Sequence, residues 1–237
     1  MQEKNFSILL VEDEPNLAFS LTLNLEEEGY KVTHVGDGAE AIDLFKNSEV
    51  YDLVLLDLMI PSLNGFEVLK EIRAIDSQTS VLMITARADD KDRIEGLSLG
   101  ADDYITKPFH LQELMLKVKR VFQRKADEKS SLSQVEPITY DGITLDVGAR
   151  SLKTHAGTFD LTQIEVDIVK EFLEHKDEVL TREYLLEKAW NMRGGISTRT
   201  VDNFIVRIRK YLENDPANPV YLKSIRGKGY RFESKQH

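Results

Sequence analysis

Five side chains with complementary chemistry each come directly after an apolar run of the chain: Glu12, Asp13, Asp57, Thr85 and Lys107. Runs of this length without polar alternation predict strands that are buried on both faces of a parallel sheet. The carboxyl ends of parallel strands meet at one edge, where open α/β sheets bind their ligands. The spacing therefore predicts that three acids, a hydroxyl and an ammonium group converge on one crevice.

Carboxylates without histidine or cysteine form a hard oxygen donor set, which suits Mg²⁺. A carboxylate beside Mg²⁺ can act as a nucleophile toward a phosphoryl group, giving an aspartyl phosphate whose oxygens the metal and a lysine neutralise. The Thr85 hydroxyl can donate a hydrogen bond to such a phosphoryl group. Taken alone, Asp57 is equally compatible with a carboxylate that ends a strand or bonds a turn.

The elements that position these residues are five repeats of a strand followed by a helix. We expect strands at 6–11, 31–35, 53–57, 80–85 and 104–105, and helices at 16–28, 41–45, 66–72, 92–99 and 111–122. Right-handed crossovers then give a doubly wound α/β domain, with a five-stranded parallel sheet and helices on both faces. The first domain is expected to span residues 1–122.

Length and composition favour a two-domain protein, since 237 residues exceed one typical domain. The sequence has no cysteine, which excludes disulfides and thiolate metal sites. The apolar run near the N-terminus is too short for a signal peptide or a membrane span. We therefore expect a soluble, cytoplasmic protein with no membrane partner.

Charge is distributed unevenly along the chain. The formal net charge is −10, but residues 188–237 contain 11 basic and 4 acidic residues. A basic terminal portion in an otherwise acidic protein is compatible with nucleic-acid binding.

Residues 123–136 are predicted to form a flexible linker, because they combine mixed charge with three serines and little apolar pattern. Residues 137–237 form the second domain, which opens with short β patterns. Thr162 and Glu165 form a capping box at the start of its first helix. A second helix is expected from Thr181 to Trp190 and a third from Arg199 to Leu212.

The third helix has an apolar stripe of Val201, Ile205, Ile208 and Leu212, which leaves basic and amide residues on its outer face. Such a face suits the DNA major groove, and the basic turn that starts at Arg226 predicts a hairpin beside it. A merely soluble helix is the alternative. The candidate contacts to double-stranded DNA are Arg199, Thr200, Asn203, Val206, Arg207, Arg209, Lys210, Arg226 and Lys228.

The first 122 residues resemble the flavodoxin-like receiver domain of two-component response regulators, through LLVEDE, LVLLDLMIPSLNGFEVL, ITAR and GADDYITKPF. The resemblance implies that a sensor histidine kinase phosphorylates Asp57. It implies Mg²⁺ ligands at Glu12, Asp13, Asp57 and the Met59 carbonyl, and a cis peptide before Pro108. Thr85 and Tyr104 would form the switch pair, and Lys107 would bind the phosphate.

This resemblance also implies a homodimer that forms on phosphorylation through ion pairs. Arg93 with Glu113 and Asp103 with Lys117 match the family pattern, although Lys117 replaces the more usual arginine and Ser98 stands where an acid is common. Each of these charges is also compatible with a solvated helix face.

The segments RTVDNFIVRIRKYL and SIRGKGYRF resemble the α+β winged-helix effector domain of the OmpR/PhoB family. The resemblance implies a recognition helix from Arg199 to Lys210, Arg226 in the minor groove, and Trp190 and Tyr230 near phosphates. A core position for Trp190 is the alternative. It also implies an RNA polymerase contact at 191–195. Phe204 replaces the usual histidine on the expected reading face.

Together these patterns predict a DNA-binding transcription regulator that is switched through Asp57 and binds tandem DNA half-sites as a dimer. We expect no enzyme activity beyond slow self-dephosphorylation. A haloacid-dehalogenase type of phosphatase requires an acid two residues after the nucleophile, where this chain has Met59. A constitutive DNA-binding protein with an unused receiver domain is the remaining alternative.

Overall fold

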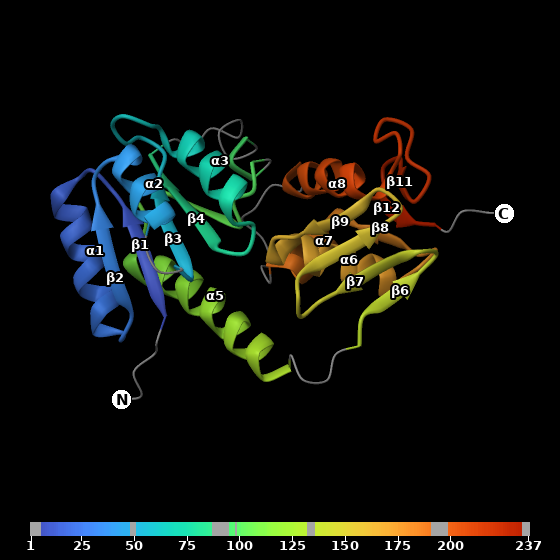
Figure 1. The fold of residues 1–237 in the computed structure, drawn as a ribbon, viewed down its shortest axis with the longest axis horizontal. Helices are drawn as coiled ribbons and strands as arrows, with labels where there is room; N and C mark the ends of the chain where they lie inside the picture. The colour runs from blue at the N-terminus through green and yellow to red at the C-terminus, as the bar shows by residue number, and fades with distance from the viewer. Residues whose placement is uncertain are drawn as a thin grey trace. The chain divides into compact units, whose positions relative to one another are not determined.

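The computed structural model describes residues 6–47, 51–86, 95–97, 99–131, 136–190 and 199–233. The chain divides into two compact units, Met1–Ser130 and Ser131–His237, and the division falls inside the segment expected to be a linker. Figure 1 shows the elements of both units. Within these described ranges, no helix has the length and apolar content needed to cross a bilayer.

The first unit contains a five-stranded sheet in the order β2-β1-β3-β4-β5, with every neighbouring pair parallel. This order is the flavodoxin-like one, in which the chain reverses direction beside β1 and creates a crevice at the carboxyl edge. Strands β3 and β4 are buried along their whole length, as their uninterrupted apolar runs predict. The strands are β1 (Ser7–Val11), β2 (Lys31–Val35), β3 (Leu53–Asp57), β4 (Ser80–Thr85) and β5 (Asp103–Thr106).

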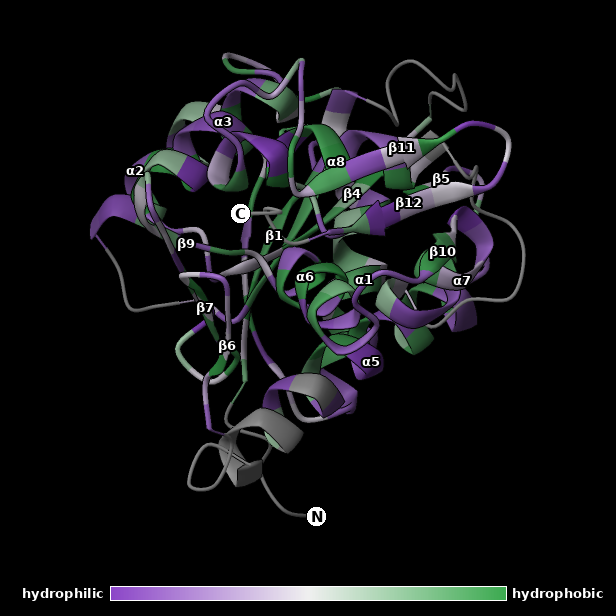
Figure 2. Cartoon of the chain, turned by 90° about the vertical axis from the view of Figure 1, so that its right-hand side faces the viewer, coloured by the Kyte–Doolittle hydropathy of each residue, from purple (hydrophilic) through white to green (hydrophobic). Residues whose placement is uncertain are grey.

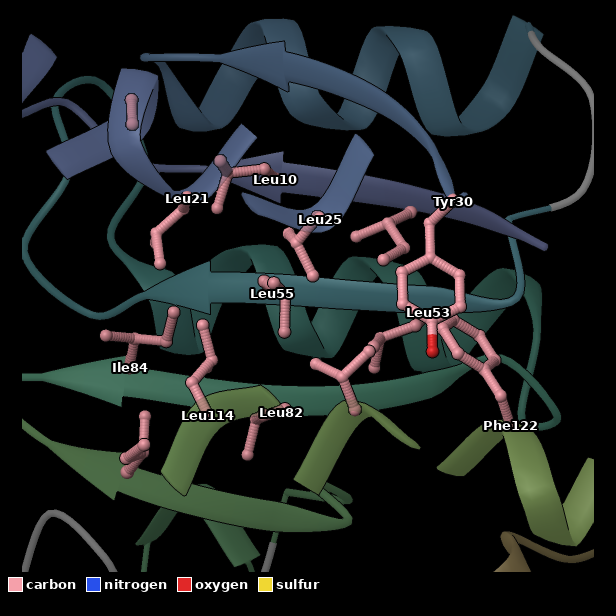
Figure 3. Close-up of a cluster of buried hydrophobic side chains, with 14 residues drawn as sticks. Leu10, Leu21, Leu25, Tyr30, Leu53, Leu55, Leu82, Ile84, Leu114 and Phe122 are labelled. Atoms are coloured by element: carbon pink, nitrogen blue, oxygen red, sulfur yellow. The ribbon is translucent and has the colours of Figure 1, made fainter. Parts of the chain in front are cut away.

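Helices cover both faces of this sheet. On one face, α1 (Pro15–Glu27) and α5 (Leu111–Ser131) pack against alternate strand residues in one buried cluster (Figure 3). Leu25, Leu55 and Leu114 of this cluster have no exposed surface. On the opposite face lie α2 (Gly38–Asn47) and α3 (Gly65–Ile75) (Figure 1). The central strands β1 and β4 are coloured hydrophobic in Figure 2, as expected for a sheet covered on both sides.

The predicted end of the last receiver helix at Phe122 is wrong, because α5 continues to Ser131. The residues after Phe122 lack an apolar stripe but include lysine, arginine, alanine and glutamate, which are good helix formers. Adding residues to an existing helix costs far less than nucleating one. Lys125 also anchors the extension, with its Nζ 3.4 Å from Oδ1 of Asp52.

The second unit opens with an antiparallel sheet in the order β6-β7-β8-β9. Three helices follow, α6 (Gln163–Glu174), α7 (Arg182–Trp190) and α8 (Arg199–Leu212), and the third helix has the predicted bounds. The predicted capping box of Thr162 and Glu165 is present at the start of α6. The strands of the opening sheet are β6 (Ile138–Tyr140), β7 (Ile143–Asp146), β8 (Ser151–Thr154) and β9 (Gly157–Asp160).

A second antiparallel sheet has the order β10-β12-β11 and forms the wing. Its hairpin strands are β11 (Leu222–Ile225) and β12 (Gly229–Phe232). The sequence did not predict β10 (Val179–Thr181), a strand of three residues that pairs with β12. Gly229 permits this pairing, since a Cβ atom there would lie 2.0 Å from the Leu180 carbonyl oxygen. The result is a winged-helix domain.

Candidate functional site

The carboxyl edge of the parallel sheet brings the predicted acids together. Ligand atoms of Glu12, Asp13 and Asp57 all lie within 4.8 Å of one another. Glu12 is fully buried and Asp57 is 3% exposed, whereas Asp13 is exposed. One open and two enclosed carboxylates form a pocket of hard oxygen donors, the chemistry that Mg²⁺ prefers.

Lys107 lies between the two buried acids. Its Nζ donates to Oδ2 of Asp57 at 2.6 Å and to both carboxylate oxygens of Glu12 at 2.9 Å. The backbone N–H of Lys107 donates to the Thr85 carbonyl at 2.7 Å, and the peptide before Pro108 is cis, as the resemblance implies. The chain end of β5 therefore delivers an ammonium group to the centre of the acid pocket.

The electrostatics of the pocket stabilise the positive charge of Lys107, which Glu12 and Asp57 share. Burial raises the pKa of the Glu12 carboxyl, the hydrogen bond from Lys107 opposes that rise, and the nearby Asp57 charge adds to it. Burial acts to lower the pKa of Lys107, but the hydrogen bonds to Asp57 and Glu12 outweigh it, so the pKa is raised. Glu12 is thus a carboxylate whose negative charge is costly unless a cation faces it.

The turn after β3 fixes the Asp57 side chain. The N–H of Met59 donates to Oδ1 of Asp57 at 2.9 Å, which leaves Oδ2 facing Lys107. Gly65 lies against this turn, where a Cβ atom would come 2.4 Å from the Asp57 carbonyl oxygen. Its N–H donates to the Leu58 carbonyl at 3.0 Å. The Met59 side chain is 53% exposed, and its carbonyl remains a predicted metal ligand.

The expected switch residues lie on adjacent strands. Thr85 ends β4 and is fully buried, and Tyr104 on β5 is 8% exposed. Tyr104 pairs in register with Met83, two positions before Thr85. The tyrosine is therefore already covered in this structure, next to the strand that carries the threonine.

The expected dimer residues are described only in part. Arg93 lies outside the described residues, and Glu113 is exposed in the first turn of α5. Lys117 donates to Asp103 of its own chain at 2.5 Å and is 7% exposed. This pair was expected to serve the contact between two chains, and here it joins α5 to β5 within one chain.

On the second unit, the exposed positions of α8 and the wing form the candidate nucleic-acid interface. Val206 is 53% exposed, and Lys210 is exposed one turn further along α8. Arg226 and Lys228 are exposed on the turn between β11 and β12, which Gly227 allows with φ +70°. The backbone of Arg199 begins α8, but its side chain lies outside the described residues, as do residues 191–198.

Several residues assigned to the outer face of α8 are instead covered, and this part of the prediction is wrong. Thr200 is 3% exposed and Phe204 has no exposed surface. Phe204 packs edge-on against Trp190 at 5.0 Å between ring centroids, so Trp190, itself 3% exposed, is a core residue. The buried face of α8 is wider than the apolar period of its sequence indicated, because α6, α7, β8 and β11 all pack against the helix.

Arg207 was also expected on the outer face, but its Nη2 lies 2.8 Å from Oε1 of Glu165. Glu165 is 1% exposed, and its Oε2 accepts from the N–H of Thr162 at 2.9 Å. The Tyr211 hydroxyl donates to Oε1 of Glu165 at 3.2 Å. A buried carboxylate must be paired, and that requirement turns Arg207 inward.

Two other predicted DNA residues, Arg209 and Tyr230, make hydrogen bonds within the domain. Arg209 donates to the Leu222 carbonyl at 2.7 Å and to the Ser224 hydroxyl at 3.0 Å. Asn203 is half-buried, and its Nδ2 has no hydrogen-bond partner within the described structure. The Tyr230 hydroxyl donates to Oδ1 of Asp202 at 2.6 Å.

Sequence reasoning missed Arg182 and Asp202, which meet Tyr230. The available signal was Asp202, a single acid in an α8 sequence whose other charged residues are all basic. An acid in the first turn is normally explained by the helix dipole, so its partners could be found only in the folded domain.

Two family models match the chain. Residues 8–119 match the response regulator receiver domain, and residues 156–232 match the C-terminal domain of transcriptional regulatory proteins. The sensory transduction protein RegX3 of Mycolicibacterium smegmatis is 38% identical over 227 residues, which cover 96% of this chain and 99% of that protein. The DNA-binding response regulator MtrA of the same species is 37% identical and covers 94% and 95%.

Among solved structures, a cysteine-to-serine mutant of RitR superimposes with a TM-score of 0.77 at 27% identity, covering 97% of this chain and all of that one. The similarity spans both domains.

Proposed function

This chain belongs to the two-component response regulators of the OmpR/PhoB type, a family of DNA-binding transcription regulators rather than enzymes, and from that premise we propose that phosphorylation of Asp57 by a sensor histidine kinase switches it. The contact of Lys107 with Asp57 at 2.6 Å supports this proposal most directly. That contact places a cation where the oxygens of a transferred phosphoryl group would need one.

In the proposed transfer, a carboxylate oxygen of Asp57 attacks the phosphorus of a phosphohistidine. The new O–P bond forms as the P–N bond breaks, and the imidazole nitrogen leaves with the electron pair. Lys107 neutralises the phosphoryl oxygens, and the N–H of Met59 holds the second carboxylate oxygen. Slow loss of the phosphoryl group to water would return the protein to its resting state.

Three carboxylates within 4.8 Å fit a divalent cation, and Glu12, Asp13 and Asp57 with the Met59 carbonyl would hold it. Mg²⁺ would supply charge neutralisation for the phosphoryl group. Lys107 alone offers one positive charge against three acids, so a divalent ion balances a pocket that is otherwise electrostatically unfavourable.

Phosphorylation adds about −1.5 to −2 charges at Asp57. We propose that the buried Thr85 hydroxyl moves toward the phosphoryl group and that Tyr104 holds its inward position behind it. The two residues lie on neighbouring strands, β4 and β5, and β5 also carries Asp103. A shift of β5 would therefore alter the surface that carries the Asp103–Lys117 pair.

We propose that the phosphorylated protein dimerises through this surface, with Glu113 and Arg93 as further partners. Asp103 and Lys117 pair inside one chain, so their use in a dimer would require them to exchange partners with a second chain. Surface ion pairs contribute little individually, so several must act together.

The proposed DNA interface consists of the exposed part of α8 and the wing turn, with Val206, Lys210, Arg226 and Lys228 as contacts and Asn203 and Arg199 beside them. The exposure of Val206, Lys210, Arg226 and Lys228 supports this choice. A dimer would bind tandem half-sites about one helical turn apart. Residues 191–195 stay a proposed contact to RNA polymerase.

Selection and sequencing of genomic DNA fragments tests the proposal. The full chain and Asp57→Ala are each incubated with fragments, with and without Mg²⁺ and a small phosphoryl donor. We expect tandem half-sites to be enriched by the full chain, more strongly with the donor, and no donor effect in Asp57→Ala. Equal enrichment in all arms would support a constitutive regulator instead, and no enrichment would refute DNA binding.

A further inference from the structure

Side chains from three separate elements meet at one carboxylate oxygen beside the wing. Oδ1 of Asp202, in the first turn of α8, accepts from Nε of Arg182 at 2.7 Å and from the Tyr230 hydroxyl at 2.6 Å. Nη2 of Arg182 also donates to the Tyr230 hydroxyl at 3.1 Å. Arg182 is the first residue of α7, and Tyr230 is the second residue of β12. We call these three residues the wing latch.

The chemistry of the wing latch makes it a strong connection. The guanidinium carbon of Arg182 lies 4.7 Å from the centroid of the Tyr230 ring, so the cation is both paired and stacked. The pKa of Tyr230 is raised to about 12, mainly by burial and next by the hydrogen bond to Asp202. The phenol therefore stays protonated and donates a charge-assisted hydrogen bond at neutral pH.

The wing needs such a connection because of how it is built. Its turn, from Arg226 to Lys228, is exposed and extends from a single hairpin. The turn residues lie beyond Ile225 and Gly229, the last paired residues of the three-stranded sheet, so strand pairing does not hold them directly. Tyr230 lies two positions after Lys228, where β12 pairs with both β10 and β11. The hydrogen bonds of the wing latch thus hold the hairpin close to its turn.

The position of Asp202 also calls for an explanation. It is the one acid in the sequence of α8, and its side chain is 39% exposed. An unpaired acid beside a phosphate backbone would weaken DNA binding. Arg182 neutralises the charge, and the hydroxyl of Tyr230 uses the same oxygen, so the acid joins elements instead of facing the DNA alone.

We propose that Asp202 is a positioning residue, which fixes the wing relative to the recognition helix so that both enter their grooves as one rigid unit. This inference rests on the proposed binding of DNA by α8 and the wing. It assigns Tyr230 a role through Asp202, in place of a direct contact to a phosphate.

The test measures whether the wing and the helix act as a unit. The affinity of the full chain is measured for a duplex carrying the half-sites enriched in the selection above, with and without Arg226→Ala. The same comparison is repeated in Tyr230→Phe and Asp202→Ala. Tyr211→Phe is the matched control, because it removes a tyrosine hydroxyl bound to a carboxylate in the same domain but away from the wing.

We expect Arg226→Ala to weaken binding about tenfold in the wild-type and Tyr211→Phe backgrounds. In the Tyr230→Phe and Asp202→Ala backgrounds, Arg226→Ala should weaken DNA binding about threefold or less. Without the wing latch, the wing contributes less to DNA affinity even when Arg226 is present. Tyr230→Phe combined with Asp202→Ala should weaken binding no more than Asp202→Ala alone, since both remove one connection.

A second readout needs no DNA. The amide of Lys228 donates to the Ile225 carbonyl across the wing turn at 3.0 Å. Hydrogen exchange at this amide should accelerate in Tyr230→Phe and stay unchanged in Tyr211→Phe. If Tyr230→Phe leaves both the exchange rate and the effect of Arg226→Ala on affinity unchanged, the proposed role of the wing latch is wrong, although the protein still binds DNA. Faster exchange in a protein that binds no DNA would instead reject the proposed function, and with it the role of Asp202 in recognition.

Discussion

Lys107 and Asp57 are 50 positions apart in the sequence, yet the Lys107 ammonium nitrogen lies 2.6 Å from a carboxylate oxygen of Asp57. The contact joins the carboxyl ends of β5 and β3, which are separated in the sheet by β4. The parallel topology is what makes it possible, since all these strands end at one edge.

The first prediction concerns the phosphoacceptor. Asp57→Asn should abolish the mass increase that a small phosphoryl donor with Mg²⁺ produces, because an amide is not a competent nucleophile. Asp52→Asn, at the other end of the same strand, should retain it. Intact-protein mass spectrometry measures both. Undiminished labelling of Asp57→Asn would place the acceptor elsewhere.

Glu12→Gln should weaken Mg²⁺ binding and raise the thermal unfolding midpoint of the metal-free protein. Burial raises the pKa of Glu12, so the fold holds this proton more tightly than the unfolded chain does. The stability contributed by the protonated form is lost as pH rises through the raised pKa, and a neutral glutamine avoids that loss. We expect Mg²⁺ affinity to fall at least about tenfold, the scale on which even outer-shell partners act.

Calorimetry with and without Mg²⁺ measures both effects of Glu12→Gln. The gain in midpoint should vanish at a pH below the ordinary glutamate pKa of 4.5, where Glu12 is itself protonated. A lower midpoint at neutral pH would show that the bond to Lys107 outweighs the cost of burial.

Gly65→Ala should impair phosphorylation without touching a reacting group. The added Cβ would lie 2.4 Å from the Asp57 carbonyl oxygen, so the turn must shift, at a cost of about 1–3 kcal/mol. Gly36→Ala is a suitable control, since its Cβ would lie 3.7 Å from the nearest atoms of Glu12 and Asp13. Rates of labelling by the donor compare the two variants. Equal rates would mean that the turn adapts.

Arg207→Ala and Lys210→Ala should separate structural from DNA-binding residues on α8. Removing Arg207 leaves the buried Glu165 without its countercharge, which should destabilise the second unit by about 3–5 kcal/mol. Lys210 is exposed, so its loss should leave stability unchanged and reduce DNA affinity with a smaller salt dependence. Urea unfolding and DNA titrations at two salt concentrations measure these effects. A stable Arg207→Ala with weakened DNA binding would return Arg207 to the interface.

The sequence by itself determined the α/β repeats, the bounds of α8 and the meeting of Glu12, Asp13, Asp57 and Lys107. Those features depend on local properties, since apolar runs define buried strands and each site residue follows a strand directly. Only the tertiary structure decided which way Arg207, Phe204 and Trp190 face and which groups meet at Asp202. Their positions depend on how α6, α7 and the wing cover α8, and the buried charge of Glu165 must find a partner from another element. Helical periodicity contains no information about either requirement.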